Sequence, residues 1–181
     1  KARTQPVTQQ VPLSGYASYY SKDNERALPG YYEVLLKTHR TKVELTASDR
    51  VAFHRYTFPK DVEKHVMINL KDANGDDRPT DTYLEQINDT VIRGYRYSTG
   101  WSKKQQIYFS AVFSQPVHLT LYHDSVQVAG NRLQGLDVKG NVAVAPVVEE
   151  LGVKVGISPV SMENAMDNIC LLYTSPSPRD R

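Results

Sequence analysis

Hydrophobic and polar residues alternate along most of the chain with the two-residue period of β-strands. In the stretch YYEVLLK, Tyr32, Val34 and Leu36 fall on one face and Glu33 on the other. Successive side chains of a strand point to opposite faces, so this pattern predicts a strand at 31–37. Runs of the same kind predict strands at 42–46, 50–58, 65–70, 83–87, 90–98, 106–114 and 117–124. Two further strands are expected within 136–148 and one within 152–160.

The number and spacing of these runs predict the fold class. About ten short strands separated by turn residues, with almost no helix, are typical of a β-sandwich or barrel. We therefore predict an all-β fold, an antiparallel β-sandwich. The run at 50–58 has apolar or aromatic residues on both faces, which predicts a central strand covered on both sides. The one helical signal is SMENAMDNI (161–169), in which Ser161 is positioned to cap the first turn.

Composition divides the chain into three parts. Residues 1–26 are polar and are expected to form an extended lead-in, and residues 27–169 the sandwich. The run CLLYTSPSPRD, which begins at Cys170, matches the translation of a transposase-type sequencing adapter. A natural Ser/Pro-rich linker is the alternative. We interpret 170–181 as a non-native tail, and without Cys170, the only cysteine, the rest of the chain can form neither a disulfide scaffold nor a cysteine nucleophile.

Charge and hydropathy exclude several classes of protein. Hydrophobic residues make up 40% and charged residues 23% of the chain, which argues against disorder. The formal net charge of +2 and the scattered Lys and Arg residues do not indicate a nucleic-acid partner. No apolar run approaches the roughly 18 residues that a membrane-spanning helix needs.

The stretch GYRYSTGWSKKQQ (94–106) contains the only tryptophan, Trp101. Gly100 frees the backbone for a turn, and this turn would place Trp101 at the tip of a loop between two strands. An exposed indole beside polar residues suits sugar recognition, because the C–H face of a pyranose packs on the ring. The alternative is a tryptophan that closes the end of the sandwich.

Other motifs carry weaker signals. DANGDD (72–77) resembles a calcium loop, but Asp77 stands where glycine is needed and Tyr83 where a glutamate is needed, so a solvated hairpin loop is the better interpretation. The sequon NDT (88–90) is interpreted as a turn. The five histidines show no pair at metal-ligand spacing on one face. For these reasons no metal-binding residue is assigned. No catalytic residue is assigned either, because a pair of catalytic carboxylates cannot be chosen without geometry.

Four segments together resemble one family. They are SGYASYYSKDNERALPGYYEV (14–34), VELTASDRVAFHRYTFP (43–59), VIRGYRYSTGWSKKQQIYFSAVFSQP (91–116) and VKVGISPVSMENAMDNI (153–169). They are similar to the N-terminal domain of glycoside hydrolase family 92, the calcium-dependent, exo-acting α-mannosidases. The resemblance implies a β-sandwich similar to the galactose-mutarotase-like sugar-domain fold, joined to a C-terminal (α/α)6 barrel. In that family the barrel carries the calcium ligands and the two carboxyl groups of an inverting mechanism.

The resemblance also implies a role for this chain without chemistry of its own. Trp101, with Tyr97 as its companion, is expected at the edge of a sugar pocket formed where the two domains meet. The expected partners are the catalytic domain and a mannose-containing glycan, and the expected location is the periplasm or outside the cell. A free-standing carbohydrate-binding module and a β-sandwich adhesion or interaction domain remain as alternatives.

Overall fold

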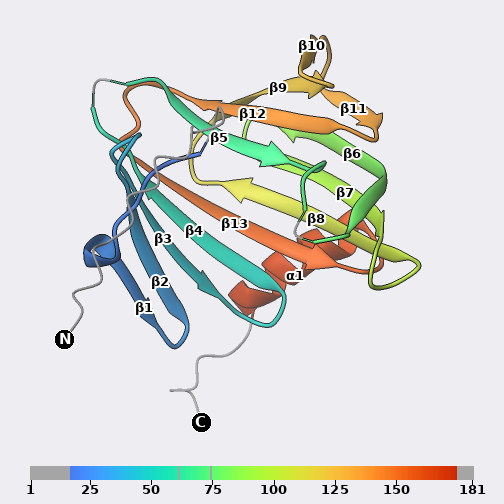
Figure 1. Cartoon of the computed structure of the whole chain (residues 1–181), viewed down its shortest axis with the longest axis horizontal. Helices are drawn as coiled ribbons and strands as arrows, with labels where there is room; N and C mark the ends of the chain where they lie inside the picture. Colours follow the sequence, from blue (N-terminus) through green and yellow to red (C-terminus); the bar gives the residue numbers. More distant parts are fainter. Residues whose placement is uncertain (1–16, 61, 74, 175–181) are drawn as a thin grey trace, which may run out of the picture.

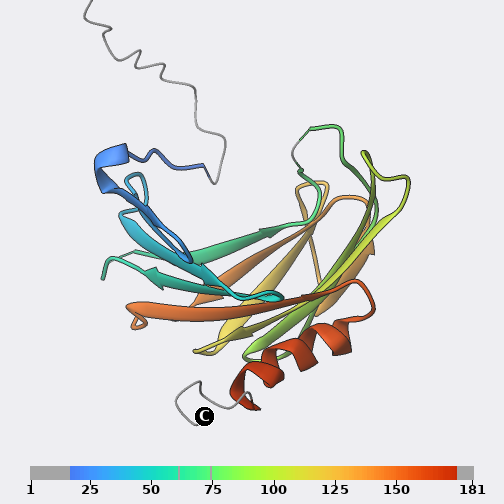
Figure 2. The ribbon, with the colours of Figure 1, turned by 90° about the horizontal axis from the view of Figure 1, so that it is seen from below.

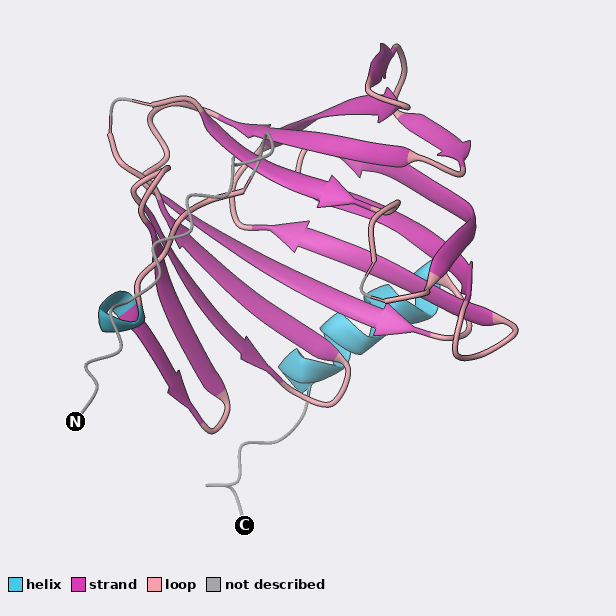
Figure 3. Cartoon of the chain, viewed as in Figure 1, coloured by secondary structure: helices cyan, strands magenta, loops and turns pink. Residues whose placement is uncertain are grey.

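The structure, a computed structural model, describes residues 17–60, 62–73 and 75–174. These residues form two antiparallel sheets packed face to face, with a single α-helix on the outside (Figure 3). The predicted all-β sandwich is therefore confirmed. Within the described residues, no helix is both long enough and apolar enough to cross a membrane.

The two sheets differ greatly in width (Figure 1). In spatial order, the large sheet consists of β1 (Glu25–Leu28), β2 (Tyr31–Leu36), β3 (Thr41–Ala47), β4 (Val51–Thr57), β13 (Glu150–Ser158), β8 (Gln105–Phe113), β7 (Val91–Thr99), β6 (Arg78–Asn88) and β11 (Arg132–Gly135). The small sheet consists of β10 (Val126–Val128), β9 (Val117–His123), β12 (Val138–Val144) and β5 (Lys64–Asn69). A short 3-10 helix, η1 (Lys22–Asn24), precedes β1.

The hydrophobic core lies between the small sheet and the β6–β7–β8–β13 part of the large sheet. Leu84, Ile92 and Leu151 from the large sheet are fully buried, as are Leu121 and Val142 from the small sheet. Every second side chain of each strand faces the partner sheet, so the apolar residues at these alternate positions form the core. The core therefore fixes the positions of the strands that carry the loops at both ends of the sandwich.

Helix α1 (Met162–Thr174) packs on the outer face of the large sheet, on the side opposite the small sheet (Figure 2). The predicted cap is confirmed, because the Ser161 hydroxyl accepts a 3.0 Å hydrogen bond from the backbone N–H of Asn164. Ala165 and Ile169 are buried against β13, and Cys170 and Leu171 are exposed. The helix thus continues through the first residues of the segment interpreted as a non-native tail. Residues 175–181 of that tail lie outside the described part, and the origin of the tail stays a prediction.

Several expected element boundaries differ from the structure. β1 begins at Glu25 and pairs with β2, so the last two residues of the expected lead-in belong to the large sheet. The segment 136–148 contains one strand, β12, in place of two. The structure adds the short strands β10 and β11, which are too short to show a clear alternation.

The expectation for the run at 50–58 is half correct. β4 is central, between β3 and β13. The expected cover on both faces is missing on the outer face, where Phe53 is 38% exposed and the Lys154 ammonium lies 5.1 Å from its ring centre. An exposed aromatic residue on a strand looks the same in sequence as a buried one. A helix that covers β13, β8 and β7 is too narrow to reach β4 as well.

Candidate functional site

Trp101 lies at the tip of the loop between β7 and β8, and its side chain is fully exposed. The structure therefore rules out the alternative in which this tryptophan closes the end of the sandwich. Gly100 begins the loop and donates a backbone hydrogen bond of 3.0 Å to the carbonyl of Ser102. A β-carbon at Gly100 would come within 2.9 Å of the Asp77 Cα, so the absence of a side chain lets this loop approach its neighbour.

The neighbour is the loop between β5 and β6, which contributes the other wall of a hollow of about 570 Å³ beside Trp101. The Trp101 hollow is lined by Asp76, Asp77, Arg78, Thr99, Gly100, Trp101 and Gln105. Arg78 and Thr99 are register partners in the β6–β7 hairpin, which brings two loops that are distant in sequence to one end of the sheet. The volume falls within the range typical of small-molecule sites.

An ion pair fixes the base of the Trp101 hollow. Nη1 of Arg96 donates a 2.5 Å hydrogen bond to Oδ2 of Asp77, and Nε of the same side chain donates to the Leu70 carbonyl at 2.9 Å. The hydroxyl of Ser98 and the Arg96 guanidinium hold the pKa of Asp77 below its ordinary value. Asp77 is therefore a fixed anion that anchors its loop, whereas Asp76 and Arg78 are exposed at the rim.

The Trp101 hollow combines an aromatic ring with charged and polar groups. An indole ring can pack against the apolar face of a sugar, while the Asp76 carboxylate, the Arg78 guanidinium and the Gln105 amide can bond its hydroxyl groups. Asp76 lies on the β5–β6 loop, and Arg78 and Gln105 are the first residues of β6 and β8, so their spacing in the sequence gave no signal. The β6–β7 register brings Arg78 beside Thr99, and the β7–β8 register pairs Gln105 with Ser98.

The structure does not bring Tyr97 into this hollow. Its ring lies on the outer face of β7, stacked on Tyr95 with ring centres 4.4 Å apart. Its hydroxyl oxygen is 2.6 Å from that of Tyr108, and burial together with this hydrogen bond raises the pKa of Tyr97 to about 12. Tyr97 belongs to a cluster with Tyr83, Tyr95 and Tyr108, whose rings support one another across three strands.

The expected turns and the weak calcium motif can also be located. At the sequon, the Asn88 side chain accepts a 2.9 Å hydrogen bond from the backbone N–H of Thr90, as in an Asx turn, which confirms the turn. In the 72–77 loop, Asn74 lies outside the described residues. Among those that are described, no group of three His, Cys, Asp or Glu residues is arranged to hold a metal ion.

Comparison with known proteins places this geometry in a family. The family model for the glycosyl hydrolase family 92 N-terminal domain matches residues 1–158. Two solved structures of the family 92 α-mannosidase BT3965 from Bacteroides thetaiotaomicron, one of them with mannoimidazole, are 30% identical with TM-scores of 0.82 and 0.83. Each comparison covers 87% of this chain and 22% of the solved one.

Two more distant structures share the fold. The family 92 glycosyl hydrolase ccman5 is 23% identical with a TM-score of 0.79, over 90% of this chain and 23% of its own. The inverting mannosidase BT2199 from Bacteroides thetaiotaomicron is 20% identical with a TM-score of 0.71, over 83% and 20%. A search of curated proteins found no match. The chain spans about a fifth of the length of these solved proteins, and by its matched domain and fold it belongs to glycoside hydrolase family 92.

Proposed function

We propose that this chain is the non-catalytic N-terminal domain of a calcium-dependent, inverting exo-α-mannosidase that acts on mannose-containing glycans. In this proposal it forms one edge of the sugar-binding cleft, and a C-terminal (α/α)6 domain supplies the chemistry. The observation that carries the proposal is the fully exposed Trp101 beside a polar hollow of about 570 Å³. A fully exposed indole beside polar groups is free to pack against the apolar face of a sugar.

The division of labour follows from what the described residues offer. An inverting glycosidase needs two carboxyl groups roughly 6.5–9.5 Å apart, one to protonate the leaving oxygen and one to activate water. Asp77 is already held by Arg96, and the other carboxylate of the hollow, Asp76, lies exposed at its rim. We therefore assign the hollow to substrate positioning and both catalytic carboxyl groups to the other domain.

Calcium is assigned to the other domain for a similar reason. Among the described residues, no three His, Cys, Asp or Glu side chains are grouped so that they could hold a metal ion, which is in keeping with this assignment. The expected location of the enzyme, in the periplasm or outside the cell, belongs to the same proposal.

The experiment uses the complete enzyme encoded by the gene that contains this sequence. Trp101→Ala should lower kcat/KM for an aryl α-mannoside by about tenfold or more, because burial of the indole against the sugar, worth about 1.5–3 kcal/mol, is lost. Trp101→Phe is the matched control and should retain most of the activity. Wild-type kinetics in the alanine variant would contradict the proposed cleft edge.

A further inference from the structure

The end of the large sheet that carries the Trp101 hollow also carries a row of hydrogen-bond donors. Arg78, at the start of β6, is the register partner of Thr99, at the end of β7. On the other side of β7, Gln105 begins β8 and pairs with Ser98. Lys104, one residue earlier in the chain, therefore lies beside Thr99. We call these three residues the Arg78–Thr99–Lys104 row.

The three side chains of the row belong to one face of the sheet. Ile92 of β7 lies in the core, and Thr99, an odd number of residues further along the strand, points to the opposite, outer face. Residues directly opposite each other on neighbouring strands share a face, which places Arg78 and Lys104 there too. Neighbouring strands are about 4.8 Å apart, so the two cationic residues are separated by about 10 Å, with a short threonine between them. Their long side chains can reach one anion from both sides.

The donors of the row are available to a ligand. Arg78 and Lys104 are exposed, and neither forms an ion pair with another described residue. The hydroxyl of Thr99, which lines the Trp101 hollow, lies between them. Lys103, next to Lys104 in the loop, is exposed as well and adds a further positive charge.

The carboxylates near the row do not cancel its charge. Asp77 is already held in an ion pair at the base of the hollow. Asp81 accepts hydrogen bonds from Tyr95 and Gln134, further from the loop that carries the indole. Asp76 is then the one exposed carboxylate that lines the Trp101 hollow among the described residues. A rim with more available cations than anions attracts a negatively charged ligand.

The chemistry of the row fits a phosphate ester. A guanidinium offers a planar fork of donors that matches phosphate oxygens, and a phosphate has three acceptor oxygens for the three donors of the row. Trp101, two residues beyond Thr99, adds an apolar surface on which a sugar ring can pack. Single-stranded nucleic acid is a poorer fit, because its sites stack successive bases on several aromatic rings along a charged groove.

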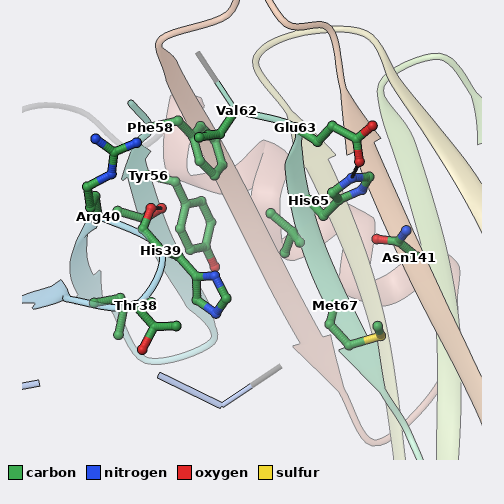
Figure 4. A pocket seen from close by; sticks show the side chains of 13 residues that line it. Thr38, His39, Arg40, Tyr56, Phe58, Val62, Glu63, His65, Met67 and Asn141 are labelled. Carbon is green, nitrogen blue, oxygen red and sulfur yellow. Dashed lines mark hydrogen bonds and ion pairs between the residues drawn. The ribbon is translucent and has the colours of Figure 1, made fainter. Parts of the chain in front are cut away.

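The pocket at the opposite end of the large sheet has no comparable row (Figure 4). It has a volume of about 580 Å³ and lies between the β2–β3 turn, the end of β4 and the edge strand β5. Val66 of β5 packs against the core beside its register partner Val142. Its two neighbours along the strand, His65 and Met67, therefore project from the outer face of the small sheet, away from the aromatic residues of that pocket.

We propose that the Trp101 hollow takes a sugar residue that carries a phosphate ester, with the phosphate bound by the Arg78–Thr99–Lys104 row and the sugar ring packed against Trp101. The row gives the cleft edge a preference for phosphorylated over neutral glycans. The choice of mannose as the sugar rests on the proposed function, whereas the row of donors does not.

The test is a titration of the 15N-labelled 181-residue chain with mannose 6-phosphate, with methyl α-mannoside and with inorganic phosphate, followed by 1H–15N NMR spectra. We expect saturable shifts at residues 76–78 and 99–104 with mannose 6-phosphate. Its affinity should exceed that of each other ligand by about tenfold or more, because it alone contacts both the row and the indole. Raising the ionic strength from about 0.02 M to about 0.2 M should weaken this binding by about threefold or more.

A double variant tests the row itself. Arg78→Gln combined with Lys104→Gln should weaken the binding of mannose 6-phosphate by about tenfold or more, because two charge-assisted hydrogen bonds are lost. The matched control, Lys37→Gln combined with Arg40→Gln, removes the same charge from the exposed β2–β3 turn at the other end of the sheet. It should change the affinity by less than about twofold, since screening limits the reach of exposed charges.

Four results would each overturn the phosphate preference. They are equal affinity for mannose 6-phosphate and methyl α-mannoside, inorganic phosphate that binds as tightly as mannose 6-phosphate, no saturable shift with mannose 6-phosphate, and wild-type affinity in the Arg78→Gln, Lys104→Gln variant. None of them alters the kinetics expected of Trp101→Ala with a neutral aryl mannoside, so the proposed function stands or falls separately. Conversely, wild-type kinetics in Trp101→Ala would remove the cleft edge and leave a phosphate-dependent shift in place.

Discussion

At the scale of single residues, Trp101 stands out because nothing in the fold depends on it. Its side chain is fully exposed, whereas Phe113, a large aromatic residue at the end of the strand that follows, is only 4% exposed and belongs to the core. Burial of apolar area is the main source of stability, so an exposed ring contributes little to it. The Trp101 ring is therefore available to a ligand or to a neighbouring domain.

This contrast gives a stability prediction. Trp101→Ala in the 181-residue chain should change the free energy of unfolding by less than about 0.5 kcal/mol, whereas Phe113→Ala should lower it by about 3–5 kcal/mol. Urea unfolding followed by far-ultraviolet circular dichroism measures both values. A loss of about 2 kcal/mol or more in the tryptophan variant would show that the ring packs against the protein.

A second residue-scale prediction concerns Glu44, a buried carboxylate on the outer side of β3. It accepts two hydrogen bonds from Arg55, at 2.7 and 2.8 Å, and a third at 2.7 Å from the Tyr31 hydroxyl. The Arg55 guanidinium, followed by the Tyr31 hydroxyl, lowers the pKa of Glu44 to about 2. Because the folded-state pKa is depressed, the stabilising contribution is present above the unfolded value of 4.5 and is lost as the pH falls toward about 2.

Glu44→Gln should therefore lower stability at neutral pH by about 1 kcal/mol, a modest value because Arg55 is half exposed. The variant should also lose less stability than the wild type as the pH falls through this window. Urea unfolding at a series of pH values from about 7 to about 2 tests both effects. Glu149→Gln, which removes an exposed partner of Lys60, is the control and should change little. Parallel acid profiles of wild type and Glu44→Gln would refute the role of this carboxylate.

At the scale of elements, the docking of α1 depends on a close approach to β13. A β-carbon at Gly156 would lie 2.1 Å from the Ala165 carbonyl oxygen and 2.8 Å from Cγ1 of Ile169. The helix could relieve this clash only by moving away from the sheet. The absence of a side chain at Gly156 therefore sets the distance between α1 and β13.

Gly156→Ala should lower the free energy of unfolding by about 1–3 kcal/mol, the usual cost of overpacking. Gly152→Ala is a matched control on the same face of the same strand, where a new β-carbon would meet Ser114 atoms no closer than 3.5 Å. Chemical unfolding of the two variants side by side makes the comparison. Equal effects at the two positions would show that helix docking does not depend on the Gly156 contact.

Most elements of this fold could be predicted from the sequence, because β2, β3 and β9 carry apolar residues at every second position, on the inner face. The bounds of β8 differ from the expected run by one residue at each end. β10 and β11 could not be predicted, since they contain three and four residues and are defined by pairing with distant partners. The stability of a strand pair depends on both partners, so it cannot be inferred from the sequence of either strand alone.

The candidate site was only partly predictable for the same reason. Trp101 could be identified, because a single tryptophan beside a turn glycine is a local feature. Tyr97 was assigned with it by proximity in the sequence, but its ring lies in the tyrosine cluster on the outer face, and its role at the sugar pocket stays a prediction. Arg78 joins the Trp101 hollow through the β6–β7 register and Gln105 through the β7–β8 register.

At the scale of the whole molecule, the sheets are unequal and leave part of the structure without a second layer. Helix α1 covers β13, β8 and β7 on the outer face, and the small sheet covers part of the inner face. Ile107 and Ile157, on inner-facing positions of β8 and β13, are 50% and 45% exposed. This face lies toward the end of the sheet that carries Trp101, which suits a domain that meets another domain there.

We propose that this domain shapes a mannosidase cleft and that the chemistry lies elsewhere in the enzyme. The most direct measurement compares the purified 181-residue chain with the complete enzyme for release of aryl alcohol from an aryl α-mannoside, each with calcium and with a chelator. We expect no turnover by the isolated chain in either condition, and turnover by the complete enzyme that is lost on chelation. Turnover of the mannoside by the isolated chain would contradict it.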